Sequence, residues 1–262
     1  MNWIAALPMY NVSPALAADW QGLLADVLSR VEPSAAIAGP DDLHAFWRRP
    51  DLLLSQTCGY PFVLGLHEYV QLIATPQFDA PGCQGASYSS VLVTRADAPF
   101  DSLHACRGAR AAYNAADSNS GYNAFRHAVA PHARNGKFFS ATLETGSHLG
   151  SLRAIAEDRA DIAAIDCVTM AFVLDEYPQL AGVLREIGYT RSSPGLPLIA
   201  SKQVPSEQIG ALRAALEQSL AAQPARALRL RLKGFSHLPR EAYESIAEME
   251  NEARVANYAR LA

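Results

Sequence analysis

Two clusters of short polar residues and glycine are the part of this sequence best suited to chemistry. Asp117–Tyr122 reads DSNSGY and Thr145–His148 reads TGSH. The apolar runs Ala109–Tyr113 and Phe138–Thr142 precede them, so each cluster stands where a strand should pass into a helix. A helix N-terminus presents free backbone N–H groups and the positive end of the helix dipole. Two such starts predict a site for one tetrahedral or carboxylate anion, and binding of that kind requires no catalysis.

Each of these residues also has a plainer structural interpretation. Ser and Asn before a helix are usually caps, worth ~1 kcal/mol each. Ser118, Asn119 and Ser120 followed by glycine exceed what one cap needs. His148 alone would be a structural histidine, but its Thr-Gly-Ser prefix favours binding, and a near-neutral pKa would favour a dianion as the pH falls. Asp166 ends a strand and could equally cap the next helix at Val168, so its two roles stay open.

Composition excludes several classes of protein. The chain has 262 residues, of which 50% are hydrophobic and 18% charged, with a net charge of −4. Such a chain can bury a core, as one large domain or two. Binders of nucleic acid show a clustered basic footprint, which is missing here. No apolar run approaches the ~20 residues that span a bilayer. No cluster of His, Cys or paired carboxylates predicts a metal or cofactor.

The four cysteines show no C-x-x-C spacing. If the chain is exported, Cys58 and Cys83 are the first pair to test for a disulfide, since both fall in predicted loops within the same half of the chain. In the cytoplasm all four should be free thiols. Cys106 and Cys167 are interpreted as small buried hydrophobic residues.

Hydrophobic periodicity predicts alternating strands and helices. Residues 14–31 carry a 3.6-residue apolar stripe, and the first ~70 residues form a βαβαβα unit with parallel strands. A second alternating set begins after Gly108, with strands at 110–114, 137–142 and 161–165. The last sixty residues are predicted as the helices 206–220, 225–232 and 240–259, although 228–232 alternates as a strand does.

Extended segments break this alternation in two places, first at 70–75 and 87–94 on either side of a loop at 76–85, and then at 183–190. One leaves the first α/β set and the other returns after the second, which is typical of two lobes joined by two crossing hinge strands. We expect lobe 1 at 1–90 plus 190–262 and lobe 2 at 91–189. Each is an α/β lobe with a mostly parallel sheet flanked by helices. A ligand is then expected in the cleft between the lobes, at the C-terminal ends of the strands.

Seven motifs in one order carry a family resemblance. They are residues 52–60 (LLLSQTCGY), 88–93 (YSSVLV), 103–108 (LHACRG), 118–122 (SNSGY), 145–148 (TGSH), 161–166 (DIAAID) and 194–197 (PGLP). Over roughly residues 1–245 the chain resembles the phosphonate-binding (PhnD-like) branch of the type II periplasmic binding proteins, the solute receptors of ABC importers. The resemblance implies a two-lobed receptor that closes over a small anion, a phosphonate, phosphate or related oxyanion.

Residue by residue, the resemblance implies that Ser118, Asn119 and Ser120 bind the anionic head of the ligand. Thr145 and His148 would add donors from the second helix start, and Asp166 would pair the ammonium of an aminoalkylphosphonate. Tyr60 and Tyr10 would close the pocket from the other lobe.

Two residues depart from the family's pattern. Asn119 stands where a hydroxyl residue is often found, and Leu149 replaces an acidic residue that often follows the histidine. An aminoalkylphosphonate ligand therefore loses one partner for its amine end. No arginine is clearly dedicated to binding the anion. Arg107 and Arg126 are available, but their periodicity suggests a turn for the first and a solvent-facing helix position for the second.

Compartment and partners follow from the same resemblance. It implies a monomer that delivers its ligand to an ABC permease and works in the periplasm, or as an extracellular lipoprotein, if a leader was removed. A native Met1 would instead place the chain in the cytoplasm. The same fold also carries leaderless enzymes and metabolite sensors, by analogy alone. No nucleophile here shows a recognisable catalytic pattern, so the sequence predicts a receptor and not an enzyme.

Overall fold

The computed structural model describes residues 2–262, which form two compact units. Unit 1 comprises the residues up to Asp79, Gln84–Ala86 and Pro194–Tyr243, and unit 2 comprises Ala80–Cys83, Ser87–Ser193 and Glu244–Ala262. Both units are therefore built from separate stretches of the chain. Their borders differ from the predicted ones mainly at the end, because the last 19 residues, predicted in lobe 1, belong to unit 2.

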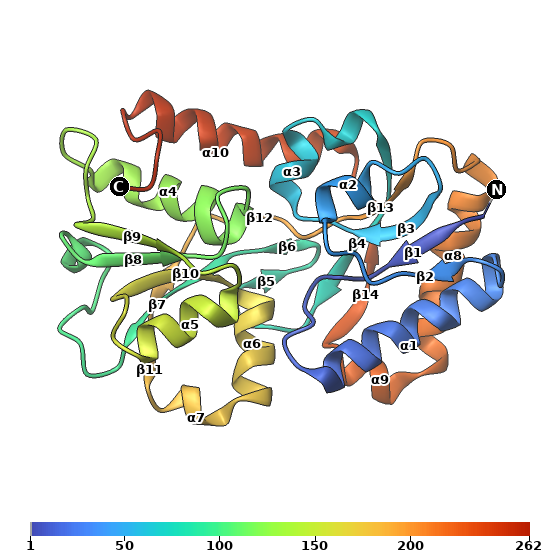
Figure 1. The fold of residues 1–262 in the computed structure, drawn as a ribbon, viewed down its shortest axis with the longest axis horizontal. Helices are drawn as coiled ribbons and strands as arrows, with labels where there is room; N and C mark the ends of the chain where they lie inside the picture. The colour runs from blue at the N-terminus through green and yellow to red at the C-terminus, as the bar shows by residue number, and fades with distance from the viewer. Residues whose placement is uncertain (1) are drawn as a thin grey trace. The chain divides into compact units, whose positions relative to one another are not determined.

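Unit 1 is a six-stranded sheet with strand order β14-β4-β13-β3-β1-β2 (Figure 1). Strand β1 pairs in parallel with β2 and β3, as the βαβαβα prediction requires, whereas β13 and β14 add antiparallel strands beside β4. The strands are β1 (Ile4–Ala6), β2 (Ala36–Ile37), β3 (Leu52–Gln56), β4 (Val70–Phe78), β13 (Leu198–Ser201) and β14 (Leu232–Ser236). The helices are α1 (Pro14–Val31), α2 (Leu43–Trp47), α3 (Gly59–Val63), α8 (Ser206–Ala222) and α9 (Pro224–Arg229).

Helix α1 shows how the sequence determines this unit. Ser13 caps it by accepting the N–H of Leu16, and Pro14 occupies its first turn, where a missing N–H costs nothing. Its six predicted apolar positions are all buried: Leu16, Trp20, Leu23, Leu24, Val27 and Leu28. Helices α8 and α9 pack beside it. The helix predicted at 225–232 is shorter than expected, since α9 ends at Arg229 and strand β14 begins at Leu232.

Unit 2 is a five-stranded sheet with strand order β11-β7-β10-β8-β9. Strands β10, β8 and β9 run parallel, while β7 pairs antiparallel with β10 and β11. The strands are β7 (Ser90–Arg95), β8 (Arg110–Tyr113), β9 (Ala141–Glu144), β10 (Ile162–Asp166) and β11 (Leu184–Tyr189). The helices are α4 (Ala124–Val129), α5 (His148–Ala156), α6 (Cys167–Glu176), α7 (Pro178–Ala181) and α10 (Glu244–Val255).

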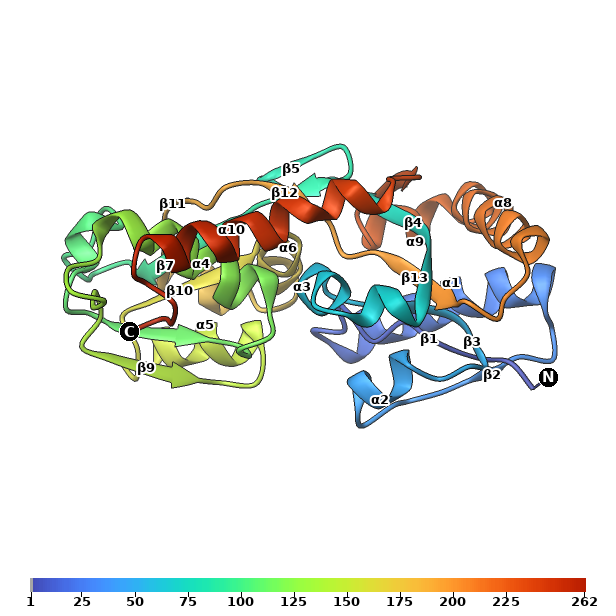
Figure 2. The same cartoon turned by 90° about the horizontal axis from the view of Figure 1, so that it is seen from above.

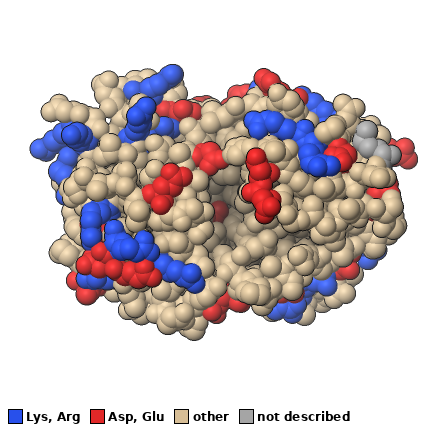
Figure 3. Space-filling model, in the orientation of Figure 1, with Lys and Arg blue, Asp and Glu red and all other residues tan. Residues whose placement is uncertain are grey.

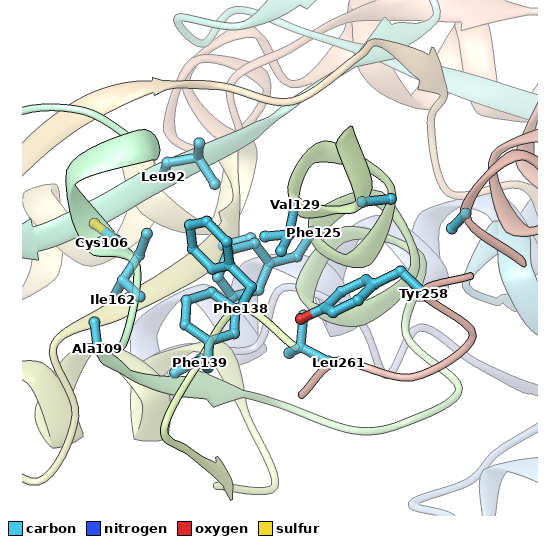
Figure 4. Close-up of a cluster of buried hydrophobic side chains, with 14 residues drawn as sticks. Leu92, Cys106, Ala109, Phe125, Val129, Phe138, Phe139, Ile162, Tyr258 and Leu261 are labelled. Atoms are coloured by element: carbon cyan, nitrogen blue, oxygen red, sulfur yellow. The ribbon is translucent and has the colours of Figure 1, made fainter. Parts of the chain in front are cut away.

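Helices cover both faces of the sheet of unit 2, with α4 and α10 on one face and α5 and α6 on the other (Figures 1 and 2). The core under α4 and α10 is aromatic (Figure 4). In it the ring of Phe139 lies 5.4 Å from that of Phe125 and 4.9 Å from that of Phe138. Tyr258 and Leu261 complete the cluster, so the end of the chain belongs to this core.

Arg126 corrects the sequence-based expectation of a solvent-facing position. Its side chain is 5% exposed and lies inside unit 2. It donates to the side-chain oxygen of Asn123 at 2.7 Å and to the carbonyl of Ala259 at 2.8 Å, and its guanidinium lies over the Tyr122 ring. The buried guanidinium is therefore hydrogen-bonded within the protein, and the bond to Ala259 links α4 to the C-terminal segment.

The chain passes between the units within residues 79–87, at 193–194 and at 243–244, and three short strands lie at the first two of these places. They are β5 (Cys83–Gln84), β6 (Ser87–Tyr88) and β12 (Ser193–Pro194), which form a three-stranded sheet of order β12-β6-β5. The sequence predicted two such crossings, at 70–94 and 183–190. Within residues 2–262 no helix is long and apolar enough to cross a membrane. On the face drawn in Figure 3 basic and acidic side chains are interspersed, and no wide basic area of the kind that binds nucleic acid is visible.

Candidate anion-binding site

The first polar cluster forms a helix start shortly after β8. Ser118 accepts the N–H of Gly121 at 3.1 Å, which makes it the N-cap of a π-helical turn at Asn119–Asn123 that continues into α4. The side chains of Ser118, Asn119 and Ser120 are all buried, between 1% and 6% exposed. Wide turns of this kind are rare and occur frequently at functional sites.

The second polar cluster reaches the first through one side-chain pair. His148 is the first residue of α5, whose N-cap is Ser147. Its Nε2 lies 2.9 Å from the Ser120 hydroxyl oxygen, and that hydroxyl lies 3.5 Å from the Ser118 hydroxyl. The two clusters that the sequence singled out are therefore joined within unit 2, and the hydroxyl of Ser120 stands between two helix starts.

Burial keeps the His148 imidazole neutral. His148 is partly exposed as a residue, yet its Nδ1 is buried and has no hydrogen-bond partner among the described residues. Burial lowers the pKa of His148 to about 4, because a charged ring would lose its hydration. The expectation that His148 gains charge near neutral pH was wrong, and at pH 7 its ring offers one N–H donor and one acceptor.

Asn114 is a polar residue of this region that the sequence motifs did not reveal. Its side-chain oxygen is buried and has no hydrogen-bond partner within residues 2–262. A Cβ placed on Gly121 would lie 1.9 Å from that oxygen and 3.1 Å from the His148 ring. Glycine is therefore the only residue type that fits at position 121, and no signal in the sequence pointed to Asn114.

Asn119 uses its side chain inside the protein. Its amide donates to the Tyr88 hydroxyl at 3.1 Å and to the Ser193 hydroxyl at 2.9 Å, and its oxygen accepts from Asn123 at 3.2 Å. Both N–H groups of the amide are thus engaged. Tyr88 and Ser193 lie in β6 and β12, so Asn119 connects the helix start to the two short crossing strands.

Asp166 caps α6, which is one of its two predicted roles. Its carboxylate accepts the N–H of Val168 at 2.8 Å and of Thr169 at 3.1 Å. It pairs across the sheet with Ser90, whose hydroxyl donates to the Ser120 carbonyl at 2.9 Å. Ser90, which was not among the predicted site residues, therefore links the end of β10 to the first polar cluster.

Thr145 braces the second cluster. Its hydroxyl contacts the carbonyls of Tyr113 and Ser147, each at 3.0 Å, and the Ser151 hydroxyl at 2.7 Å. These bonds fix the turn that precedes α5. The structure gives Thr145 this positioning role, and its contact with a ligand stays a prediction.

Tyr10 and Tyr60 belong to unit 1. Tyr10 has a positive φ of 66° and is 7% exposed, with its ring 6.3 Å from Trp20 and 5.1 Å from Phe78. Tyr60 is buried in α3 beside Cys58, the residue before the helix. Tyr10 is therefore part of an aromatic core cluster, and a ligand contact by either tyrosine stays a prediction.

Unit 1 also has a cavity of its own, of about 260 Å³. It lies after β1 and β2 and is lined by Leu7, Asn11, Gln21, Leu24, Ile37 and neighbouring small residues. None of the eight predicted site residues lines it. Among the described residues no three His, Cys, Asp or Glu side chains are grouped to hold a metal ion.

A comparison with known families identifies the family of the chain. Residues 13–243 match the family model described as "ABC transporter, phosphonate, periplasmic substrate-binding protein". The chain belongs to this family. The resemblance carried by the seven motifs is thereby confirmed, as are the two-lobed α/β fold and the role of a substrate-binding protein of an ABC transporter.

Several solved structures have a similar fold. A binding protein of an ABC phosphonate transporter from Pseudomonas aeruginosa is 21% identical with a TM-score of 0.82, and the match covers 99% of this chain and 90% of that one. PhnD1 from Prochlorococcus marinus, in complex with methylphosphonate, is 15% identical with a TM-score of 0.75. That match covers 96% of this chain and 97% of that one. A Xanthomonas citri protein bound to ATP is 16% identical with a TM-score of 0.69 over 97% of both chains. A comparison with curated proteins finds no match.

The family also settles the broad class of partner and compartment. Its members are periplasmic substrate-binding components, a class defined by binding and not by turnover, and they work with a small ligand and a membrane permease.

Proposed function

We propose that this substrate-binding protein holds the oxyanion head of a small phosphonate at the joined helix starts of unit 2. Ser118 and Ser120 supply hydroxyl groups, the turn at Asn119–Asn123 supplies backbone N–H groups, and His148 supplies an imidazole N–H. The observation that carries the proposal is the 2.9 Å contact between the Ser120 hydroxyl and His148 Nε2. It brings donors from two helix starts to one point, where the dipoles of both helices favour an anion.

The donors of the proposed site carry no net charge. The His148 ring stays neutral, and Arg126 is engaged by Asn123 and Ala259. The head group is therefore held by neutral donors, which suit phosphonate, phosphate and carboxylate oxygens alike. Methylphosphonate, bound by a structural neighbour of 15% identity, is the first ligand to test.

The amine end of a ligand has one candidate partner. We propose that Asp166 makes this contact while it caps α6, and that Tyr60 and Tyr10 contribute from unit 1. Leu149 offers no second carboxylate, so the chain should show little preference for an aminoalkylphosphonate over an alkylphosphonate of similar size.

Calorimetry tests this assignment. Methylphosphonate, 2-aminoethylphosphonate, phosphate, phosphite, methanesulfonate and succinate should be titrated into the protein under one buffer condition. We expect saturable binding of at least one phosphonate and weaker binding of the sulfonate, which carries a single charge. Binding of succinate alone, or of none of the six, would overturn the assignment.

We also propose that the protein releases its ligand unchanged to an ABC permease outside the cytoplasmic membrane. Recovery of the ligand with its original mass after long incubation tests the absence of turnover. Fractionation of cells that express the gene from its native start tests the compartment, including the alternatives of a lipoprotein and of a cytoplasmic sensor. Size-exclusion chromatography with light scattering tests the expected monomer.

A further inference from the structure

Two cysteines that are 84 positions apart in the sequence lie in contact within unit 2. The sulfur atoms of Cys83 and Cys167 are 3.5 Å apart. Cys83 lies in β5, one residue before the chain passes back to unit 1, and Cys167 is the first residue of α6, directly after Asp166. The sequence had instead favoured Cys58 and Cys83 as the first pair to test, with Cys167 as a buried hydrophobic residue.

The backbone around the two cysteines is fixed by hydrogen bonds. The carbonyl of Ser89 accepts the N–H of Cys167 at 3.2 Å, and the N–H of Ser89 donates to the carbonyl of Gly82 at 3.0 Å. Gly82 has a φ of +92°, and a Cβ there would lie 3.0 Å from the Cβ of Cys167. Glycine therefore allows the loop to approach the helix start closely, and both thiols are held at short range.

We propose that Cys83 and Cys167 are a redox pair that forms a disulfide in an oxidising compartment. The proposal rests on the contact and on the anchored backbone, and it does not depend on the ligand assignment. The two sulfurs must approach from 3.5 Å to about 2.05 Å. The family is periplasmic, and in that compartment disulfides form and persist.

The chemistry requires an oxidant, for which a small or protein disulfide of the glutathione type suffices. The Cys83 thiolate attacks one sulfur of that disulfide and releases the other as a thiolate, giving a mixed disulfide on Cys83. Cys167 then loses its proton, attacks the Cys83 sulfur and releases the second thiolate. The two protein thiols lose two protons and two electrons, and the oxidant becomes two thiols.

The two cysteines differ in their exposure to an oxidant in solution, and this difference sets the order of these steps. Cys83 is partly exposed, whereas Cys167 is 1% exposed. The hydrogen bond with Cys83, together with burial, raises the pKa of the Cys167 thiol well above its usual range. Cys83 is therefore the residue that meets the oxidant, and Cys167 is the resolving thiol.

The bond would tie a connecting segment to the core of unit 2. Ala80–Cys83 is bounded on both sides by residues of unit 1, Asp79 and Gln84. A cross-link to the start of α6 closes a long loop in the unfolded chain, and closing such a loop stabilises the folded state. Oxidation should raise the midpoint of thermal unfolding by roughly 5–15 °C.

The experiment uses the full chain in glutathione buffers of increasing oxidised fraction, followed by alkylation and mass spectrometry. We expect two of the four thiols to resist alkylation after oxidation, and one linked pair of peptides that contain Cys83 and Cys167. Cys58→Ser is the matched control and should form the same bond. Cys83→Ser should lose both the bond and the thermal shift.

Two further outcomes separate a redox pair from mere proximity. In Cys167→Ser the glutathione adduct should persist on Cys83, and in Cys83→Ser no adduct should form on Cys167. Four alkylated thiols at every redox ratio, or a bond that includes Cys58 or Cys106, would overturn the proposal.

Discussion

The hydroxyl oxygen of Ser120 lies 2.9 Å from Nε2 of His148, so the turn after β8 and the first residue of α5 meet at one side-chain contact. The strands β8 and β9 that lead to the two residues are parallel neighbours. Parallel neighbours end at the same edge of a sheet, which brings the helix starts that follow them together. This contact is the structural basis for treating two separate polar clusters as one anion site.

Ser120→Ala should weaken the binding of methylphosphonate about 10- to 100-fold, because a hydrogen bond to a charged group is worth about 1.5–3 kcal/mol. Calorimetry measures the change. Ser29→Ala is the control, since its hydroxyl donates to the Asp26 carbonyl on the exposed side of α1. Unchanged affinity in Ser120→Ala, with the fold intact by circular dichroism, would contradict the site.

His148 should make the protein less stable in mild acid. Its pKa is about 4 in the folded chain, against about 6.5 in an unfolded one. Between these values the unfolded chain binds a proton that the folded chain does not. The free energy of unfolding should therefore fall by about 1–3 kcal/mol as the pH drops from about 6.5 to 4. Urea unfolding across this range should show a smaller loss for His148→Gln, and an identical loss would contradict the buried neutral ring.

Asn119→Ala should lower the free energy of unfolding by about 2–3 kcal/mol, because it leaves the buried Tyr88 and Ser193 hydroxyls without their donor. Urea denaturation measures the loss. Asn251→Ala is the control, since Asn251 is exposed and accepts from Arg254 on the same helix. Equal stability of the two variants would show that the amide of Asn119 does not brace the crossing strands.

Asp161→Asn should cost about 2 kcal/mol of stability at neutral pH, because the Asp161 carboxylate accepts from the backbone N–H and the guanidinium of Arg110. These bonds lower the pKa of Asp161 below its usual value. Its contribution is thus complete above the ordinary pKa of an aspartate and is lost as the pH falls. Chemical denaturation at several pH values should show the variant and the natural chain converging in acid.

A matched variant separates this effect from the general loss of a surface carboxylate. Asp97 also bonds an arginine, Arg95, but its side chain is 72% exposed. Asp97→Asn should change the free energy of unfolding by less than about 0.5 kcal/mol. If Asp97→Asn lowered the free energy of unfolding as much as Asp161→Asn does, the bonds between Asp161 and Arg110 would not be the cause of the effect.

The sequence predicts local features of this protein well, because they depend on neighbours along the chain. The apolar stripe of α1 and the helix start at Ser118 were both visible from residue type and spacing. The family resemblance added the two-lobed fold, which the matching family model confirms. The eight predicted site residues fall in both units, and their ligand contacts stay predictions.

Pairings between distant residues could not be predicted in the same way. The strand β14 begins at Leu232, where a helix was predicted, and it pairs with β4, more than 150 positions earlier in the chain. The amide of Asn119 finds partners 31 and 74 positions away. Cys83 finds Cys167 at 84 positions, a contact that no spacing rule selects. Each depends on the packing of the whole unit.

The interleaving of the two units has a consequence for how the protein is made. Unit 1 needs Pro194–Tyr243, and the core of unit 2 needs Ala253, Tyr258 and Leu261. A ribosome delivers the chain from its N-terminus, so neither unit can complete its core until these late segments have been synthesised. The discontinuous architecture therefore postpones completion of both cores until almost the whole chain has been made.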